Sequence, residues 1–213
     1  MTGLILKDFL LVKKTLVYLI VVILFFGGIY SAVDNSYFMS FFISIMMISV
    51  VISTMSYDEF YHWDRYVATL PLTRRQIVGA KYLSAMLFFA AGAGASLMVG
   101  LTVPTLHGSF LTLEDACVIA LAPMMGLVGV AVVIPCYYRF GAQQSRMVML
   151  VLYGIPSLVL VVVMRFAPQL LEGVMVIWPG MAQLLVGVVG VTAVVMVLSF
   201  FLSVRILERK ELK

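Results

Sequence analysis

The stretch Leu16-Val-Tyr-Leu-Ile-Val-Val-Ile-Leu-Phe-Phe-Gly-Gly-Ile29 contains no charged residue, and eleven of its residues are Leu, Ile, Val or Phe. At about −0.3 to −0.6 kcal/mol each, these side chains favour insertion into a membrane by roughly 3–7 kcal/mol. They lie within the apolar segment Thr15–Ala32, which is long enough to cross the hydrocarbon core. Tyr30 stands where a signal peptide would need a small residue, so we predict an uncleaved membrane span.

Five more apolar stretches of comparable length follow along the chain. They are Tyr37–Met55, Tyr82–Val103, Ala116–Tyr138, Met147–Met164 and Met181–Ile206. Hydrophobic residues make up 63% of the 213 residues and charged residues only 11%, which is outside the range of soluble domains. The sequence therefore predicts an all-α polytopic membrane protein with six transmembrane helices, organised as a single domain over residues 1–213.

The basic residues are distributed unevenly between the polar segments that separate these spans. Thirteen of the fourteen Lys and Arg residues fall in alternate segments, which share one side of the membrane, and only Arg165 falls on the other side. The thirteen are Lys7, Lys13, Lys14, Arg65, Arg74, Arg75, Lys81, Arg139, Arg146, Arg205, Arg209, Lys210 and Lys213. Because positive charge in short loops is retained in the cytoplasm, we predict a multi-pass protein with both termini cytoplasmic. The net charge of +4 then reflects the membrane edge and gives no reason to expect nucleic-acid binding.

The N-terminal segment, residues 1–14, has its own helical pattern. Apolar residues recur at helical spacing at Ile5, Phe9 and Val12, while Lys7 and Lys14 share another face. This pattern predicts an amphipathic helix that lies in the membrane interface. A simple extension of the first span is the alternative.

The segment Arg165–Gly180 lies on the side opposite the basic segments. Its apolar part, Leu170–Trp178, is bracketed by Pro168 and Pro179 and is too short to cross the membrane. A re-entrant or interfacial hairpin over residues 165–180 fits this pattern, with Trp178 at headgroup depth. The alternative is a fraying end of the sixth span.

The segment 57–71, between the second and third spans, is predicted to be a short helix parallel to the membrane. One of its faces is apolar, another is polar, and Pro71 ends the helix. The apolar face comprises Phe60, Trp63, Val67 and Leu70, and the polar face comprises Asp58, His62, Arg65 and Thr69. Such a helix could rest on lipid or bind a cytosolic protein. Aromatic residues beside carboxylates favour a protein partner, because polar faces that contact lipid are usually rich in Lys. After Pro71, Thr73 and Gln76 form a capping box for the third span.

Several kinds of chemistry have no signature in this chain. No glycine-rich loop precedes Lys14-Thr15, so the chain has no P-loop for ATP hydrolysis. His62 and His107 fall on opposite sides of the membrane and cannot share a metal, and Ser96 has no histidine within a span to act as its base. We therefore predict no catalytic residue, no metal site and no enzymatic activity. No ionisable residue lies in the middle of a span, which disfavours proton coupling, although an ion-coupled secondary transporter remains an alternative.

Two sets of residues carry a resemblance to a known family. The first set is Leu6-Lys7-Asp8 with Lys13-Lys14, and the second lies within Tyr57–Tyr82. The second set comprises Tyr57-Asp58-Glu59, Trp63-Asp64-Arg65-Tyr66, Leu70-Pro71, Arg74-Arg75, Val78 and Lys81-Tyr82. In these residues, and in its length and six spans, the chain resembles the small ABC-2 type exporter permeases. It is similar to the bacterial permeases that export amphipathic or antimicrobial peptides such as phenol-soluble modulins.

The resemblance implies a permease in the bacterial cytoplasmic membrane that moves a hydrophobic or amphipathic substrate, a peptide being one candidate, out of the cell. It implies two cytoplasmic ATPase subunits that bind ATP and Mg, a second permease copy or paralogue, and no cofactor on this chain. It also implies that the segment 57–71 is the coupling helix and that residues 165–180 are the family's outer hairpin. The implied ATPase interface comprises Asp58, Glu59, Tyr61, His62, Trp63, Asp64, Arg65 and Tyr66.

The family places its second and fifth spans along the seam between two permeases, which implies a substrate path there. The candidates are Phe42, Met46, Ser49 and Ser53 on the second span and Tyr153 on the fifth. Alternatively, each serine bonds a carbonyl group of its own helix. A rival from another class is the six-span substrate-capture subunit of an energy-coupling importer. Such a subunit should carry a ribbon of small residues on its first span, where this chain offers only Gly27 and Gly28.

Overall fold

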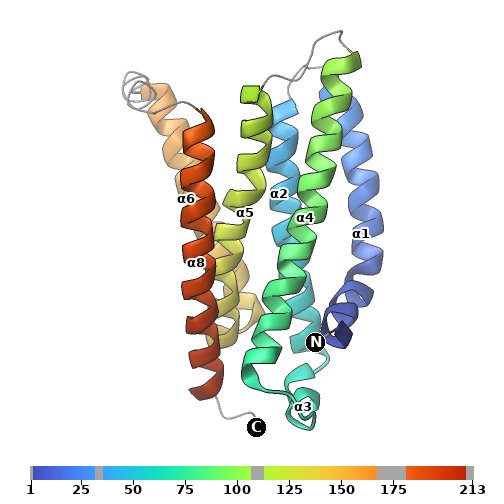
Figure 1. Ribbon diagram of the computed structural model, residues 1–213, viewed down its shortest axis with the longest axis vertical. Coiled ribbons are helices and arrows are strands. Elements are labelled where there is room, and N and C mark those ends of the chain that lie inside the picture. Colours follow the sequence, from blue (N-terminus) through green and yellow to red (C-terminus); the bar gives the residue numbers. More distant parts are fainter. Residues whose placement is uncertain (1, 32–35, 107–112, 167–180, 210–213) are drawn as a thin grey trace.

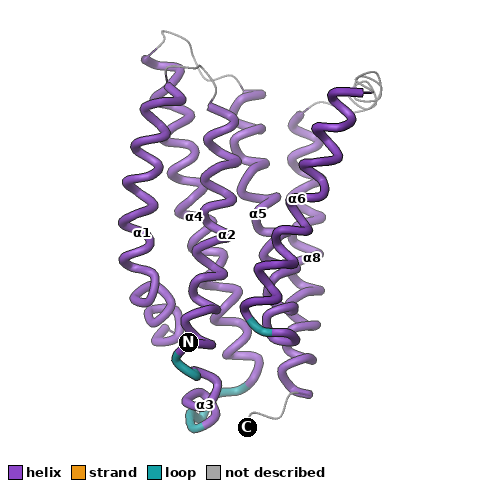
Figure 2. The backbone as a smooth tube through the Cα atoms, turned by 180° about the vertical axis from the view of Figure 1, so that it is seen from behind, coloured by secondary structure: helices purple, strands orange, loops and turns teal. Residues whose placement is uncertain are grey.

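The computed structural model describes residues 2–31, 36–106, 113–166 and 181–209, and almost all of them are helical. The helices are α1 (Thr2–Ser31), α2 (Ser36–Phe60), α3 (Trp63–Ala68), α4 (Arg74–Leu106), α5 (Leu113–Phe140), α6 (Ala142–Phe166) and α8 (Met181–Arg209). All except α3 are long and apolar enough to cross a membrane (Figures 1 and 2). The predicted all-α fold with six membrane-spanning helices is confirmed.

The six long helices form a bundle with α2, α4 and α5 at its centre. Helix α1 packs on α2 and α4, α8 packs mainly on α5, and α6 contacts α5 and, less extensively, α2. Helix α3 lies at the end of the bundle where α1 begins and α8 ends (Figure 1). We call this end the α3 end.

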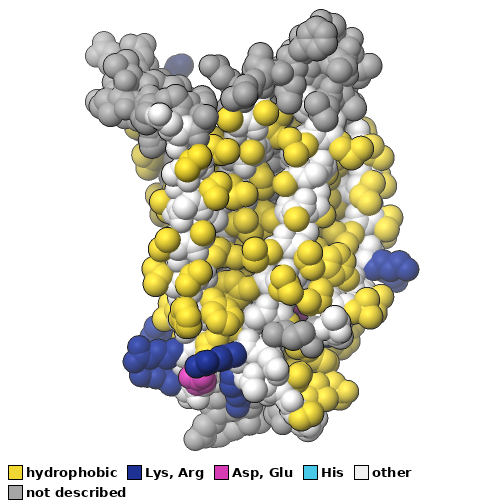
Figure 3. Space-filling view, in the orientation of Figure 1, with side chains coloured by type: hydrophobic (Ala, Val, Ile, Leu, Met, Phe, Trp, Pro, Cys, Tyr) yellow, Lys and Arg dark blue, Asp and Glu magenta, His cyan; other side chains and the backbone are white. Residues whose placement is uncertain are grey.

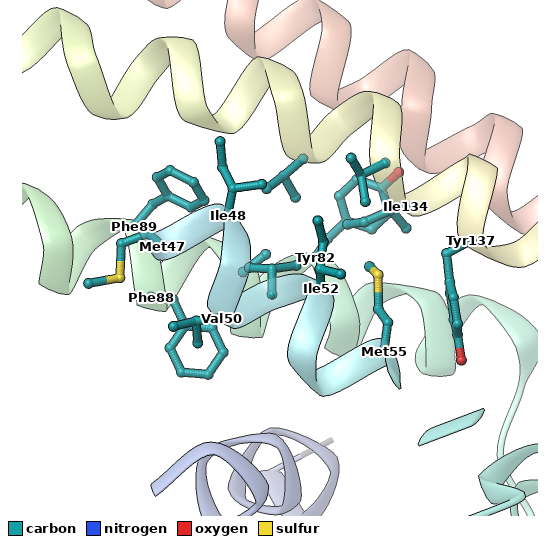
Figure 4. Packing of buried hydrophobic residues seen from close by; sticks show 14 of the residues in the cluster. Met47, Ile48, Val50, Ile52, Met55, Tyr82, Phe88, Phe89, Ile134 and Tyr137 are labelled. Atoms are coloured by element: carbon teal, nitrogen blue, oxygen red, sulfur yellow. The ribbon is translucent and has the colours of Figure 1, made fainter. Parts of the chain in front are cut away.

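The core is built where the three central helices meet. Phe88 and Phe89 of α4, Ile48 of α2 and Ile134 of α5 are almost completely buried (Figure 4). Gly126 of α5 faces the ring of Phe89, and a methyl group at this position would overlap it. Because lipid is as apolar as these side chains, close packing, and not removal of apolar surface from water, holds the helices together.

The outer surface is a broad hydrophobic band with basic residues toward one end. Apolar residues on α1, α6 and α8 are strongly exposed, as at Leu24, Leu150 and Val186. Most of the Lys and Arg side chains visible in Figure 3 lie toward the lower end, which is the α3 end. Among the described residues, every Lys and Arg except Arg165 belongs to the half of the bundle that contains α3. This placement matches the predicted segregation of charge.

The prediction of one helix over residues 57–71 is wrong in its continuity. Helix α2 runs on to Phe60, and α3 covers only Trp63–Ala68. Between them, His62 adopts the left-handed helical conformation, with φ 51° and ψ 41°. The break also removes Phe60 from the predicted apolar face, and its side chain is 75% exposed. The physical reason lies in the last turn of α2, where Asp58 and Glu59 are held by partners on three other helices. The chain can change direction only beyond those anchors.

Two other predicted segments differ in how far the structure describes them. Residues 2–14 are helical and continue into the first span without a break, because α1 runs from Thr2 to Ser31. Their location in the membrane interface stays a prediction. The predicted hairpin at 165–180 lies outside the described residues, apart from the last two residues of α6, Arg165 and Phe166.

Candidate functional site at the α3 end

Four charged side chains from three helices meet in a buried cluster at the α3 end. The ammonium group of Lys81 on α4 donates to Asp8 Oδ1 at 3.0 Å and to Asp58 Oδ2 at 2.6 Å. Lys7 on α1 donates to Asp58 Oδ1 at 2.5 Å, and its Nζ lies 3.3 Å from Asp8 Oδ1. Ser84 completes the cluster by donating to Asp8 Oδ2 at 2.8 Å. The cluster therefore ties the first turns of α1, the last turn of α2 and the beginning of α4 together.

The cluster is balanced in charge and largely shielded from solvent. Two lysines face two aspartates, and Asp8, Asp58 and Lys81 are only 2%, 6% and 6% exposed. Burying a charge is costly unless it is paired and hydrogen-bonded, and here each carboxylate accepts at least two hydrogen bonds or ion-pair contacts. Loss of a single member would leave an uncompensated buried charge.

Trp63 connects α3 to this cluster. The Lys7 ammonium lies over its indole ring, 4.2 Å from the ring centre, which is a close cation–π contact. One turn later, Val67 is 4% exposed and fixes the same side of α3 against the bundle. A displacement of α3 would therefore act on the ion pairs between α1, α2 and α4.

Glu59 ties the same end of α2 to α6. Its Oε2 accepts a hydrogen bond of 2.6 Å from the backbone N–H of Ala142, the first residue of α6. A carboxylate at a helix N-terminus is favourable because the free N–H groups there carry partial positive charge. Gly141, with φ 93°, makes the tight turn from α5 that brings this N–H group to Glu59. Adjacent acidic residues thus anchor α2 to α1 and α4 through Asp58, and to α6 through Glu59.

The α2–α3 junction also exposes a set of aromatic side chains, which we call the aromatic patch. Its members are Tyr57, Phe60, Tyr61 and Tyr66, with exposed fractions of 37%, 75%, 64% and 57%. The rings of Phe60 and Tyr61 are in edge-to-face contact at 5.1 Å. His62 and Arg65 are exposed beside them. Exposed aromatic residues with an arginine are the composition enriched at protein–protein interfaces.

A comparison with protein families finds a match to the model of the ABC-2 family transporter protein over residues 3–208. The chain belongs to the ABC-2 transporter family. The match covers nearly the whole chain and includes α3 and all six spans except the terminal residues Thr2 and Arg209. Permeases of this family are membrane subunits that work with a separate ATPase. No curated protein and no solved structure gives a significant match to the chain.

The eight predicted ATPase-contact residues of the permease differ in whether their side chains are exposed or bound to internal partners. Tyr61, His62, Arg65 and Tyr66 are exposed. Asp58 faces the buried cluster, Glu59 is exposed but its carboxylate is bonded to α6, and Trp63 is half-buried over Lys7. The side chain of Asp64 lies outside the described set. Contact of these residues with an ATPase remains a prediction, but Asp58 is committed to internal partners and is not displayed on the surface.

The ATPase interface predicted from the sequence did not include the cluster residues that fix the α2–α3 junction to the bundle. Lys7, Asp8 and Lys81 belong to the motifs that carried the family resemblance, yet nothing in their local pattern indicates that they meet. Phe60 was expected on an apolar face but belongs to the aromatic patch because of the break at His62.

The five predicted substrate-path residues lie along α2 and α6. Phe42, Met46, Ser53 and Tyr153 are half-buried, and Ser49 is exposed. Ser53 donates to the carbonyl oxygen of Ser49 at 2.8 Å, as expected if the serines bond their own helix. Tyr153 donates to the Met125 carbonyl oxygen at 3.1 Å and so joins α6 to α5. A substrate path along these residues stays a prediction.

Proposed function

We propose that this permease is the transmembrane subunit of an ATP-driven exporter in the bacterial cytoplasmic membrane, with its α3 end and both termini in the cytosol. Two partner ATPase subunits bind ATP and Mg, and a second permease copy or paralogue completes the complex. The cargo is hydrophobic or amphipathic, a peptide being one candidate.

The observation that carries the proposal is the construction of the α2–α3 junction. The junction exposes the aromatic patch, where a partner can bind, and it is connected through Trp63 to Lys7 and the buried cluster. When the ATPases close on ATP, they displace α3, and Trp63 transmits the displacement through Lys7 and Asp58 to α1, α2 and α4 together. Glu59 extends the linkage to α6.

The distribution of charge supports the proposed orientation and energy source. Basic residues gather at the α3 end, and the buried charges at that end are already neutralised within the cluster. A substrate-capture subunit of an importer needs no such connection between an exposed patch and several spans. An ion-coupled carrier would use an ionisable residue inside the membrane, whereas in this chain no ionisable residue lies in the middle of a predicted span.

Co-purification with a co-expressed ABC ATPase tests the docking surface. Phe60→Ala and Tyr66→Ala should each weaken retention of the ATPase at least fivefold, because exposed aromatic anchors carry much of an interface's affinity. Phe166→Ala and Tyr18→Ala are the matched controls, since these rings are 81% and 71% exposed but lie away from the patch. Equal retention in all four variants contradicts the docking surface.

Direction of transport and orientation need a second experiment. Proteoliposomes that contain both subunits, with ATP outside, should accumulate an amphipathic peptide in their lumen through those permeases whose α3 end faces outward. Accumulation that proceeds without ATP, or under an ion gradient alone, would favour the ion-coupled alternative. A reporter fused after Arg209 that is active only outside the cell would contradict the proposed orientation.

A further inference from the structure

A groove between α5 and α8 opens on the surface toward the α3 end and is separate from the aromatic patch. It has a volume of about 750 Å³. That volume is within the 300–1,000 Å³ typical of small-molecule sites. Its walls include Ala131, Val132 and Pro135 of α5 and Val195, Leu198 and Leu202 of α8. Three arginines line one end: Arg139, Arg205 and Arg209. The groove is therefore apolar over most of its length and cationic at its mouth.

The dimensions of the groove match one leaflet of a bilayer. Ten residues separate Val195 from Arg205 on α8, which corresponds to about 15 Å along a helix that rises 1.5 Å per residue. The hydrocarbon core of a bilayer is about 30 Å thick, so half of it is also about 15 Å. An acyl chain can lie against Leu198 and Leu202 while the headgroup of the same lipid reaches the arginines.

The three arginines are exposed and differ from Lys7, Lys81 and Arg146, whose charged groups have polar partners within the bundle. Lys7 and Lys81 are paired with aspartates, and Arg146 donates to Ser56 Oγ at 2.9 Å. Within the described part of the chain, Arg139, Arg205 and Arg209 form no ion pair, and no carboxylate lines the groove. Glu208 belongs to the same last turn of α8, but it does not line the groove. An excess of positive charge at a membrane edge would be met by basic residues at any exposed positions. The convergence of arginines from two helices on one apolar groove is therefore a separate feature.

We propose that this groove binds an anionic phospholipid, with its phosphate group at Arg139, Arg205 and Arg209 and one acyl chain along α8. Basic pockets between membrane helices are suited to acidic headgroups, because charge attraction acts in addition to burial of the acyl chain. The bound lipid fills the space between α5 and α8. There Ser199 donates to the Ala131 carbonyl oxygen and shares a hydrogen bond with Tyr82 Oη at 2.5 Å. The lipid thus extends the contact that holds α8 to the centre of the bundle.

Native mass spectrometry of the purified full-length permease tests the proposal on the unmodified chain. After exchange into vesicles of equal phosphatidylglycerol and phosphatidylcholine content and mild detergent extraction, the protein should retain phosphatidylglycerol at least tenfold over phosphatidylcholine. Equal retention of the two lipids would overturn the proposal. Inorganic phosphate in the buffer should not displace the lipid, and displacement by phosphate would assign the arginines to a free anion instead.

A matched pair of triple variants locates the site. The groove variant carries Arg139→Gln, Arg205→Gln and Arg209→Gln, and the control carries Lys13→Gln, Lys14→Gln and Arg75→Gln, which removes the same charge from exposed positions of the same end. A basic residue close to an anionic headgroup contributes about a fivefold attraction, and we expect only lipid in such direct contact to survive the detergent extraction. We expect retained phosphatidylglycerol to fall at least tenfold in the groove variant and less than twofold in the control.

Other outcomes for these variants contradict the groove. An equal fall in both triple variants would show general attraction by the basic end. Unchanged lipid in the groove variant, with or without loss of the co-purified ATPase, would also overturn the proposal, and loss of the ATPase would then assign these arginines to the partner. The comparison of the two lipids on the unmodified protein does not depend on how well either variant folds.

Discussion

Lys81 and Asp58 form a buried ion pair of 2.6 Å that joins the chain segment before α3 to the segment after it. Asp58 lies in the last turns of α2, and Lys81 lies near the beginning of α4. The 22 residues between them, including all of α3, therefore form a loop whose two ends are fixed to each other and to α1. Because Trp63 of α3 also contacts Lys7, a displacement of α3 would act on the ion pairs of this cluster.

Removing one lysine from the cluster should strongly destabilise the bundle. Lys81→Met leaves Asp8 and Asp58 with one ammonium group between them, and breaking a buried pair typically costs about 3–5 kcal/mol. Unfolding in mixed detergent should show this loss as a lower denaturation midpoint. Arg75→Met, an exposed change on the same helix, should alter stability by less than about 0.5 kcal/mol. Equal effects of the two variants would contradict the role of the cluster.

Trp63→Ala should separate transport from ATPase binding. The substitution removes the ring over Lys7 and costs about 0.5–2 kcal/mol of contact energy. Tyr57, Phe60 and Tyr61 of the aromatic patch are left in place, whereas Tyr66 loses its ring contact with Trp63 at 5.0 Å. We expect retention of the ATPase within about threefold of the parent but a much larger fall in ATP-driven transport, whereas Trp63→Phe should keep most of both. Full transport by the alanine variant would exclude transmission through Trp63.

His62 occupies a backbone conformation that few residues tolerate. With φ 51°, a β-branched residue such as valine is strained here, and His62→Val should cost about 1–2 kcal/mol of unfolding free energy. His62→Asn should be close to neutral, because asparagine enters the left-handed region more readily. Thermal unfolding in detergent compares the two. If valine is tolerated as well as asparagine, the folded protein does not keep the left-handed backbone conformation at residue 62.

The capping box at the start of α4 should contribute measurably to stability. The Thr73 N–H donates to Gln76 Oε1 at 3.0 Å, and the Gln76 N–H donates to Thr73 Oγ1 at 3.3 Å. Thr73→Ala removes the second bond and should cost about 0.5–2 kcal/mol. Thr69→Ala serves as control, because the Thr69 hydroxyl bonds only the carbonyl oxygen of Tyr66 in its own helix. A larger loss at Thr69 than at Thr73 in the same unfolding assay would argue against the cap.

Close packing of α6 on α5 depends on Gly129. A methyl group there would overlap the ring and hydroxyl of Tyr153, so Gly129→Ala should cost about 1–3 kcal/mol by overpacking. Gly154→Ala is the control, since a methyl group at that position meets no atom within 4 Å. Adding Tyr153→Ala to Gly129→Ala should recover part of the loss by relieving the overlap. No recovery in the double variant would mean that α6 does not pack through this contact.

Much of the architecture follows from the sequence alone. The spans are defined by apolar length, as in Leu16–Ile29, and helix formation inside a membrane is enforced because every backbone polar group must be bonded within its own segment. The capping box at Thr73 and Gln76 is equally local, since its two partners are three residues apart. The motif residues Lys7, Asp8, Asp58 and Lys81 were recognised as family features, although their contacts were not.

Tertiary structure decided which way those residues face. A helical repeat places Asp58 on a polar face, but only the packing of α1 and α4 against α2 brings Lys7 and Lys81 to it from 51 and 23 residues away. The same anchoring moves the break to His62 and exposes Phe60. The convergence of Arg139 and Arg205 on one groove likewise depends on how α8 lies on α5. Local patterns fix what a segment can form, whereas the partners of its charges are set by the packing of helices distant in sequence.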